Sequence, residues 1–233
     1  MTEMTEVRRA ILDRLADELA CLSKGHPVRV AIDGRTASGK TTLANELALF
    51  IEECGRPVIR TSIDGFHKPK IERYARGRYS PEGYYYDARD LRAIRSMLLD
   101  PLGPGGSGIY RTASFDLEQD RPIEQEPQKA SANAIVIVDG TFLQRPELEA
   151  GWDATIYVKV SEGEAERRGM MRDAVLLGGH EAAGQLYASR YRPAFALYEK
   201  ACDPEERADA IVDNEELARP GLLFRTGARL DRS

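Results

Sequence analysis

The chain has 233 residues, of which 42% are hydrophobic and 30% are charged, and its formal net charge is −5 at pH 7. A globular chain of this length can bury a core without metals or disulfides, so we expect one domain over residues 1–233. The negative charge excludes a bulk attraction to nucleic acid or to an anionic membrane, so an anionic ligand needs a local cluster of side chains.

The first sixty residues alternate between helix and strand. Apolar residues recur every three or four positions over 5–22, which predicts an amphipathic helix. A β-branched run over 27–33 predicts a strand, and a glycine-rich loop and a helix over 41–54 follow it. The run 56–64 predicts a second strand, which ends at Asp64. A helical crossover of this kind joins parallel strands.

The rest of the chain continues the alternation after one long interruption. Residues 65–87 are rich in Arg, Lys, Tyr, Gly and Pro and lack a period, which is typical of a long functional loop. A continuous apolar run over 134–140 has Asp139 near its end and is typical of a buried parallel strand. We expect the last dozen residues to form a loose tail. The further predicted elements are a helix over 88–100, a hairpin over 109–123, strands over 155–160 and 208–214, and helices over 162–177 and 181–201, the last interrupted by Pro193.

The segment between the first strand and its helix carries the clearest motif. Gly34, four residues, and then Gly39-Lys40-Thr41 match the G-x-x-x-x-G-K-[ST] phosphate-binding pattern, in the strand–loop–helix context that it requires. Glycines let successive backbone N–H groups point inward at oxygens, and the start of a helix adds its positive dipole end. Lys40 can reach the β- and γ-phosphates, and the Thr41 hydroxyl can ligate Mg²⁺. We expect the phosphate chain to be bound by Gly34, Arg35, Thr36, Ala37, Ser38, Gly39, Lys40, Thr41 and Thr42.

The motif alone does not say what becomes of the phosphate. A GTPase switch would need a guanine-reading N-K-x-D sequence, which this chain lacks, and the D-x-x-G match at residues 100–103 lies in a turn after a helix. An ATP-driven machine would usually bring further motifs or a longer chain. A small-molecule kinase needs a general base, an acceptor pocket and mobile basic residues over the transferred group.

The sequence offers candidates for all three needs. Asp64 ends a strand at the sheet edge that carries the glycine loop, where it could accept the proton of an attacking hydroxyl or simply begin a turn. Asp139 ends a buried strand, where a carboxylate holds Mg²⁺ or its water, or else caps a turn. Arg168 and Arg172 stand four apart on one helical face and could clamp phosphate oxygens. The pocket material after Asp64 comprises Arg73, Arg76, Arg78 and the tyrosines of 82–87, for which plain packing is the alternative.

Beyond these single motifs, several segments resemble one family. They are 30–48 around the glycine loop, 60–69 with S-I-D-G-F-H, 135–143, Arg168-x-x-x-Arg172-Asp173, 191–200 and 208–214. Together they look like the phosphoribulokinase/uridine kinase family, of which the bacterial P-loop pantothenate kinases are relatives. The likeness runs from about Val28 to Asn214.

This resemblance implies a fold, a reaction and a set of roles. The implied fold is α/β of the P-loop NTPase type, with three α/β/α layers, a central, mainly parallel sheet and a helical lid over about 162–180. The implied reaction uses ATP and Mg²⁺ and transfers the γ-phosphate to a hydroxyl of a small metabolite. The implied catalytic residues are Lys40, Asp64, Arg168 and Arg172, and the implied metal residues are Thr41 and Asp139.

The resemblance also implies an acceptor region, and there the chain departs from uridine kinases. Tyr86 and Asp87 lie where those enzymes place part of the nucleoside pocket, and 113–121 lies where they place a base-contacting hairpin. Phe115 stands before the hairpin aspartate in place of tyrosine, and Asp120 is one of two residues that replace a histidine. The D-G-F-H-K-P run looks closer to the pantothenate- and sugar-kinase-like branches. We expect acceptor contacts from His67, Arg76, Tyr85, Tyr86, Asp87, Phe115 and Asp120.

These patterns lead to one main hypothesis about partners and two alternatives. We expect a small-molecule phosphate acceptor, a nucleoside first and pantothenate or a sugar second. A nucleotide-binding switch protein without an acceptor is the alternative of another class. A homo-oligomer and a preference for ATP over GTP are left open.

The location of the protein is predicted from its cysteines and its apolar runs. Cys21, Cys54 and Cys202 lie far apart, and the chain has neither a signal-peptide pattern nor an uncharged apolar run of about 18 residues. We therefore expect a cytoplasmic protein without nucleic-acid or membrane partners.

Overall fold

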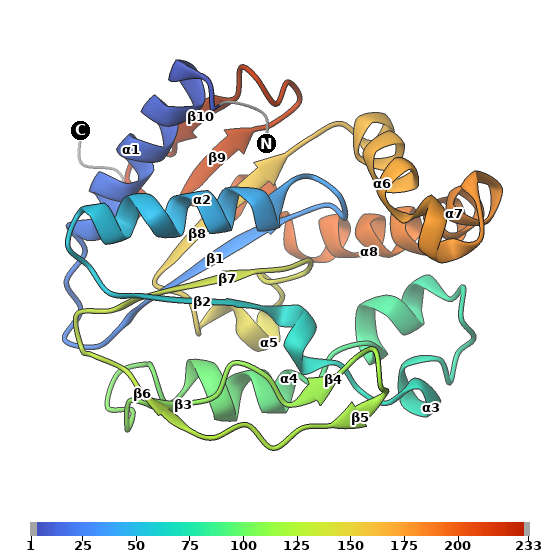
Figure 1. Ribbon diagram of the computed structural model, residues 1–233, viewed down its shortest axis with the longest axis horizontal. Coiled ribbons are helices and arrows are strands. Elements are labelled where there is room, and N and C mark those ends of the chain that lie inside the picture. Colours follow the sequence, from blue (N-terminus) through green and yellow to red (C-terminus); the bar gives the residue numbers. More distant parts are fainter. Residues whose placement is uncertain (1–3, 231–233) are drawn as a thin grey trace.

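The structure, a computed structural model, describes residues 4–230 and is built around one six-stranded sheet (Figure 1). The strand order is β10-β9-β8-β1-β7-β2, and every neighbouring pair is parallel except β9 with β10. Helices cover both faces, so the predicted three-layer α/β/α fold with a mainly parallel sheet is confirmed. The strands of the sheet are β1 (Val28–Gly34), β2 (Val58–Ser62), β7 (Ile135–Asp139), β8 (Ala154–Lys159), β9 (Ala210–Asp213) and β10 (Gly221–Phe224).

The predicted helices are present, with bounds set by local capping. The helix predicted over 5–22 begins after Thr5, whose side chain caps its first turn. The helix predicted over 88–100 begins after Asp90, which caps the next turn in the same way. The helices are α1 (Glu6–Ala20), α2 (Lys40–Glu53), α3 (Lys70–Arg73), α4 (Leu91–Ala93), α5 (Pro146–Glu149), α6 (Glu162–Leu177), α7 (His180–Leu186), α8 (Arg192–Cys202) and α9 (Pro204–Arg207), with a 3₁₀ turn η1 (Ile63–Phe66) and π-helical turns η2 (Gly83–Asp87), η3 (Ile94–Leu99) and η4 (Tyr187–Tyr191).

The two faces of the sheet are packed by different helices. On one face α1 and α2 cover strand residues such as Val30 and Ile137. On the other face η3 and α5 cover the alternate residues, such as Ala31 and Val136. Because successive strand side chains point to opposite faces and both faces are covered, these central strands have to be apolar throughout, as their sequences are.

The expectation of a loose tail over the last dozen residues was wrong for residues 222–230, whereas residues 231–233 lie outside the described part of the chain. Residues Gly221–Phe224 form β10, which pairs antiparallel with β9 and places Leu222 opposite Val212. Leu230 is buried in the core formed by α1 and α2. A short apolar edge strand that follows directly after a turn offers too few residues for a recognisable period, which is why the sequence did not reveal it.

The predicted hairpin and the predicted long loop hold more structure than expected. Within 109–123, only Phe115–Asp116 and Arg121–Pro122 pair as a hairpin, β4 with β5. The segment Ile109–Tyr110 (β3) pairs instead with Gln128–Lys129 (β6), beyond the predicted range. The loop over 65–87 contains α3 and η2.

Two further details concern helical segments. The helix predicted over 181–201 is interrupted next to Pro193, as expected: α7 passes into the π-helical turn η4, and α8 begins at Arg192, one residue before the proline. None of the helices over residues 4–230 combines the length and the apolarity that a membrane span needs.

Candidate active site

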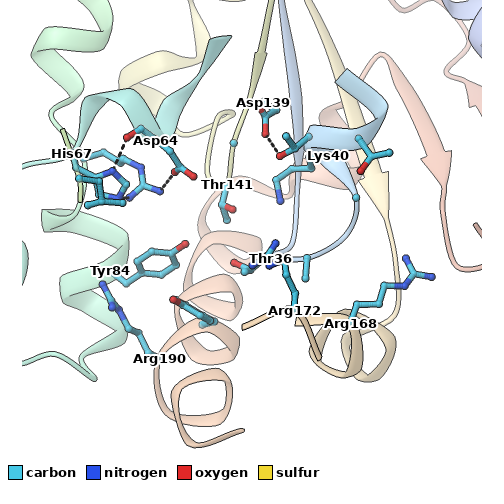
Figure 2. Close-up of a pocket in the computed structure, with 18 of the residues that line it drawn as sticks. Thr36, Lys40, Asp64, His67, Tyr84, Asp139, Thr141, Arg168, Arg172 and Arg190 are labelled. Atoms are coloured by element: carbon cyan, nitrogen blue, oxygen red, sulfur yellow. Dashed lines mark hydrogen bonds and ion pairs between the residues drawn. The ribbon is translucent and has the colours of Figure 1, made fainter. Parts of the chain in front are cut away.

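A cavity of about 470 Å³ lies beyond the carboxyl ends of β1, β2 and β7. Parallel α/β sheets bind their ligands at this edge, and the volume is within the range of small-molecule sites. Figure 2 shows Lys40, from the glycine loop and α2, on one side of the cavity and Asp64 and His67, from the segment after β2, on the other. Residues of α6 and η4 complete the lining. The sheet therefore brings together residues that lie far apart in the sequence.

The glycine loop is shaped by two positions that only glycine can fill. Gly34 has φ +149° and Gly39 has φ +96°, both in the region that favours glycine. A Cβ atom on Gly34 would lie 2.5 Å from the Val158 carbonyl oxygen, and one on Gly39 would lie 2.5 Å from Nδ2 of Asn214. The Asn214 side chain donates a hydrogen bond to the Ser38 carbonyl at 2.8 Å and so holds the turn. The motif spacing is thus a requirement of close backbone packing.

The loop residues divide into those that face the cavity and those that anchor the loop. Arg35 is directed away from the cavity: its guanidinium donates to both carboxylate oxygens of Glu199 at 2.9 Å and lies 4.4 Å from the centre of the Phe195 ring. Gly34 and Ser38 do not line the cavity either. The predicted loop residues that line it are Thr36, Ala37, Gly39, Lys40, Thr41 and Thr42.

Lys40 is a buried cation surrounded by carboxylates. Burial lowers the pKa of Lys40 to about 8, although Asp33, Asp139 and Asp64 all act to raise it. Asp33 lies fully buried beneath the loop, where it accepts hydrogen bonds from the Gly34 N–H at 2.8 Å and from the Tyr198 hydroxyl. An anion in the cavity would favour the charged form of Lys40, which suits a phosphate ligand.

Thr41 and Asp139 meet at the point where the resemblance implies a metal. The Thr41 hydroxyl donates to Oδ2 of Asp139 at 2.6 Å, and Nη2 of Arg60 lies 2.6 Å from Oδ1 of the same carboxylate. In the part of the chain that the structure describes, no group of three His, Cys, Asp or Glu side chains is placed to hold a metal ion. Two protein oxygens at one point nevertheless fit Mg²⁺, because this ion keeps several waters and phosphate oxygens among its ligands.

Asp64, Arg89 and His67 form a hydrogen-bonded triad on the opposite side of the cavity. Asp64 lies in η1, two residues past the end of β2, and not at the strand end as predicted. Nη2 of Arg89 lies 2.6 Å from Oδ1 of Asp64, and Nη1 of Arg89 donates to Nε2 of His67. Because a guanidinium can only donate, Nε2 carries no proton, and Nδ1–H of His67 donates to the Asp64 carbonyl at 2.9 Å. The triad therefore fixes the tautomer of His67 and the position of the Asp64 carboxylate.

The charges of the triad follow from this geometry. Burial, and after it the Arg89 charge, lower the pKa of His67 to about 4, so the ring is neutral near pH 7. Desolvation opposes ionisation of Asp64, but Arg89 and Lys40 outweigh it and hold the pKa of Asp64 below its ordinary value. The Asp64 side chain is 64% exposed, so an ionised carboxylate faces the cavity.

The two predicted lid arginines line the cavity and differ in how they are held. Arg168 pairs with Glu164 at 2.7 Å and donates to the backbone carbonyls of Asn214 and Glu215 at 3.0 and 2.7 Å. Arg172 pairs with its neighbour Asp173 at 2.7 Å, and its side chain is 60% exposed. Arg168 thus fixes α6 to the strand ends, whereas Arg172 has room to turn toward a ligand.

Most residues predicted to contact the acceptor do not line this cavity. His67 does, whereas Tyr86 and Phe115 line a second cavity of about 860 Å³ that shares His67 and Arg89 with the first. Tyr85 is buried in an aromatic cluster, with its ring centre 5.1 Å from that of Phe142, which is the packing role considered as its alternative.

The three remaining predicted contacts are engaged in ion pairs. Arg76 pairs with Asp87 at 2.7 Å, outside both cavities. Asp120 accepts from Nη1 of Arg73 at 2.8 Å and from the Lys70 N–H at 3.0 Å, and so ties the hairpin to α3. These residues hold the wall of the cavity together from outside it.

Several cavity residues were not predicted from the sequence. Arg89 is a single arginine in a segment with no motif, and only its neighbours in space, Asp64 and His67, identify it. Tyr191 is the first residue of the resembling segment 191–200, but nothing in that segment indicated that it lines the cavity. Arg73 and Tyr84, which the sequence gave as pocket material, do line the cavity. The unpredicted lining residues are Tyr74, Arg89, Leu117, Gly140, Thr141, Arg190, Tyr191 and Leu217.

Comparisons with known proteins identify the fold. No family model matches the sequence, and no curated protein matches it. A structure described as a possible uridine kinase from Bacillus stearothermophilus is 24% identical with a TM-score of 0.69, over 87% of this chain and 97% of that chain. A candidate fructose transport system kinase from Silicibacter sp. TM1040 is 24% identical with a TM-score of 0.65, over 82% and 95%. A D-glycerate 3-kinase from Cryptococcus neoformans is 13% identical with a TM-score of 0.57, over 93% and 99%. The chain thus has a uridine kinase-like P-loop fold, as the resemblance predicted.

Proposed function

We propose that this protein is an ATP-dependent small-molecule kinase that transfers the γ-phosphate of ATP to a hydroxyl group of a metabolite. The observation that carries the proposal is that a phosphate-binding loop and an ionised carboxylate, Asp64, line one cavity from opposite sides. Its structural neighbours are described as kinases of different small molecules. This likeness of fold supports kinase activity by analogy but does not define the acceptor.

In this mechanism the two sides of the cavity take different parts. The loop N–H groups and Lys40 bind the phosphate chain of ATP, which favours the charged form of Lys40. The acceptor hydroxyl lies between the γ-phosphate and Asp64. Its oxygen forms a bond to phosphorus while the bond from phosphorus to the departing ADP oxygen breaks, and the Asp64 carboxylate takes the hydroxyl proton. General-base assistance of this kind is typically worth 10²–10⁴-fold in rate.

The metal and the lid support the same transfer. Mg²⁺, when bound, neutralises charge on the phosphate oxygens. The Thr41 hydroxyl and the Asp139 carboxylate would hold it, and Arg60 orients that carboxylate. Arg172 can leave Asp173 for a phosphate oxygen, because the Arg172 side chain is 60% exposed and water can replace part of the ion pair. Closure of the lid would exclude water and suppress hydrolysis of ATP.

The identity of the acceptor stays a prediction. The residues assigned to a nucleoside are divided between two cavities: His67 lines both, while Tyr86 and Phe115 line only the second. A nucleoside that contacts all three would have to extend past Arg89 from one cavity into the other. Pantothenate or a sugar could be phosphorylated from the first cavity alone. The alternative of a switch protein without an acceptor gives no role to a carboxylate across the cavity from the loop.

Transfer to an acceptor is tested by following both products. We would incubate the protein with Mg²⁺ and ATP labelled in its γ-phosphate, together with nucleosides, pantothenate, sugars or sugar phosphates, and measure ADP release and labelled acceptor. The expected result is ADP release above basal hydrolysis that matches labelled acceptor in amount. Basal ADP release that no compound raises, with the label appearing only in inorganic phosphate, would contradict the kinase proposal for these acceptor classes.

A further inference from the structure

The Asp64 side of the cavity is rich in buried cations. Arg73, Arg89 and Arg190 line it from three different segments, namely α3, the turn before α4, and η4. Arg73 and Arg190 are 3% and 6% exposed, and the Arg89 side chain is 10% exposed. Within residues 4–230, Asp64 is the one carboxylate lining this side, since Asp139 belongs to the loop side. Three guanidinium groups therefore face one carboxylate.

These arginines are not equally neutralised by the protein. Arg89 pairs with Asp64, and Arg73 pairs with Asp120 outside the cavity. Arg190 makes no ion pair with any carboxylate among the described residues. Its guanidinium carbon lies 4.7, 5.2 and 5.7 Å from the ring centres of Tyr84, Tyr74 and Tyr191, and its Nε has no hydrogen-bond partner in this part of the chain.

Aromatic faces stabilise a guanidinium only partly. Each contact is worth about 0.5–2 kcal/mol, whereas taking an ion out of water costs several kcal/mol unless an opposite charge accompanies it. The pKa of Tyr74 reflects the same excess of positive charge. Desolvation opposes ionisation of the Tyr74 phenol, yet Arg73 and Arg190 hold its pKa below the ordinary value. The pocket around Arg190 is therefore built for an anion that the protein itself does not provide.

We infer that the acceptor carries an oxyanion, a carboxylate or a phosphate monoester, which binds Arg190 while its hydroxyl is presented to Asp64. This inference rests on the kinase function proposed above. Figure 2 shows Arg190 and Tyr84 on the same side of the cavity as Asp64 and His67, across from Arg168, so Arg190 is placed for the acceptor and not for the triphosphate. A planar guanidinium can donate two parallel hydrogen bonds to such a group. A neutral nucleoside would leave the buried charge of Arg190 without an anion.

The first test measures anion binding without turnover. The full chain is saturated with Mg²⁺ and a non-hydrolysable ATP analogue, which fills the γ-phosphate position, and inorganic phosphate is then titrated while the melting temperature is recorded. We expect phosphate to raise the melting temperature of the wild type and not of Arg190→Met. Arg14→Met is the matched control, because the Arg14 guanidinium also lies over a ring, 5.3 Å from the centre of Phe224, but outside the cavity. An equal shift in wild type and Arg190→Met, or no shift in the wild type, would overturn the inference.

The second test compares acceptors that differ only in the anion. The pairs are glycerate and glycerol, pantothenate and pantothenol, and a sugar phosphate and its parent sugar, with uridine as the neutral nucleoside. We expect kcat/KM to be about 10- to 100-fold higher for the anionic member of the pair that is used, the range of a hydrogen bond to a charged group. Arg190→Met should remove this ratio through the KM of the acceptor and leave the KM of ATP unchanged. A higher kcat/KM for the anionic member of the glycerate or pantothenate pair indicates a carboxylate, and one for the sugar phosphate indicates a phosphate.

The outcomes separate this inference from the proposed function. Phosphorylation of a neutral member as efficiently as its anionic partner, unaffected by Arg190→Met, would leave the kinase function standing and refute the anion. Phosphate binding that depends on Arg190, with no phosphorylated product from any pair, would support the anion site and count against the kinase function.

Discussion

The two sides of the cavity are built by different means. The loop side is built on one contiguous stretch, residues 34–42, with Asp139 beside it, and the shape of the stretch depends on backbone conformation and close packing at Gly34 and Gly39. The Asp64 side is assembled from short, irregular segments that are joined by side chains: Arg89 reaches Asp64 across 25 positions of the sequence, and Arg73 reaches Asp120 across 47.

This difference follows from what each side has to recognise. A phosphate chain is the same in every nucleotide-dependent enzyme, so backbone N–H groups can bind it, and their geometry is encoded by glycines at fixed spacing. An acceptor differs from enzyme to enzyme and is bound by particular side chains, which can come from anywhere in the chain. The loop side should therefore be sensitive to backbone shape, and the Asp64 side to the loss of single charges.

The largest expected effect is that of Asp64→Asn, which removes one charge and keeps the shape. We expect turnover to fall by about 100- to 10,000-fold, equivalent to about 3–5 kcal/mol of transition-state free energy, because an amide cannot take the hydroxyl proton. The affinity for ATP should stay within about twofold, since the loop side is unchanged. Steady-state ADP release measures the turnover, and calorimetric titration with ATP measures the affinity for ATP. Near-normal turnover in this variant would remove Asp64 from the mechanism.

Gly39→Ala tests whether the loop side depends on backbone shape. Both Gly39 and Gly77 have φ +96°, so alanine at either position costs about 1–2 kcal/mol of backbone strain. At Gly39 the new methyl group also meets the Asn214 amide, whereas no atom lies within 4 Å at Gly77. We expect Gly39→Ala to lower the free energy of unfolding by about 2–4 kcal/mol. Gly77→Ala should lower it only by the backbone strain of about 1–2 kcal/mol. Urea unfolding of both variants measures the difference, and equal losses would show that the contact with Asn214 is not required.

The same contrast explains what the sequence could predict. The parallel strands, the helices and the loop follow from apolar periods and from a motif whose residues are contiguous, so the fold and the loop side could be predicted. Asp64, Asp139, Arg168 and Arg172 were found because each was predicted at the end of a strand or on a regular helix face. The structure places all four in the cavity lining, although Asp64 lies in η1, two residues past the end of β2.

The acceptor wall could not be predicted by the same means. Arg89 and Arg190 belong to no period or motif, and their importance comes from what lies opposite them in space. Tyr85 stands beside Tyr84 in the sequence, yet the π-helical turn η2 buries the first and leaves the second in the cavity. Sequence spacing cannot separate two adjacent tyrosines without knowledge of that turn.

The pH dependence of stability tests the charge network on the Asp64 side. His67 has a pKa of about 4 in the folded protein, because it is buried and faces Arg89 and Arg73, and an ordinary pKa near 6.5 when unfolded. Between these values the unfolded chain binds more protons, so stability is retained above about pH 6.5 and lost as the pH falls toward 4.

The matched variant for this test is His67→Gln, which cannot titrate. We expect the free energy of unfolding of the wild type to fall between pH 7.5 and pH 5 by about 2 kcal/mol more than that of His67→Gln. Urea unfolding at the two pH values gives both differences, and the subtraction removes the contribution of carboxylates that titrate in the same range. Parallel pH dependences would mean that the imidazole is not held neutral by Arg89.

The smallest expected effect is that of Asp120→Asn, which loosens the Asp64 side from outside the cavity. Asp120 is the ion-pair partner of Arg73, a side chain that is 3% exposed, so an amide leaves a buried cation with less compensation. Because the Asp120 side chain is 26% exposed, solvent replaces part of the lost interaction, and we expect about 1 kcal/mol of destabilisation. Asp100→Asn is the control, since its pair with Arg95 is about half exposed on both sides and should contribute less than about 0.5 kcal/mol. If the Asp64 side depends on single charges, Asp120→Asn also raises the KM of the acceptor, while the KM of ATP stays at the wild-type value. A parallel rise in both constants would show that the hairpin supports the whole cavity and not the acceptor wall alone.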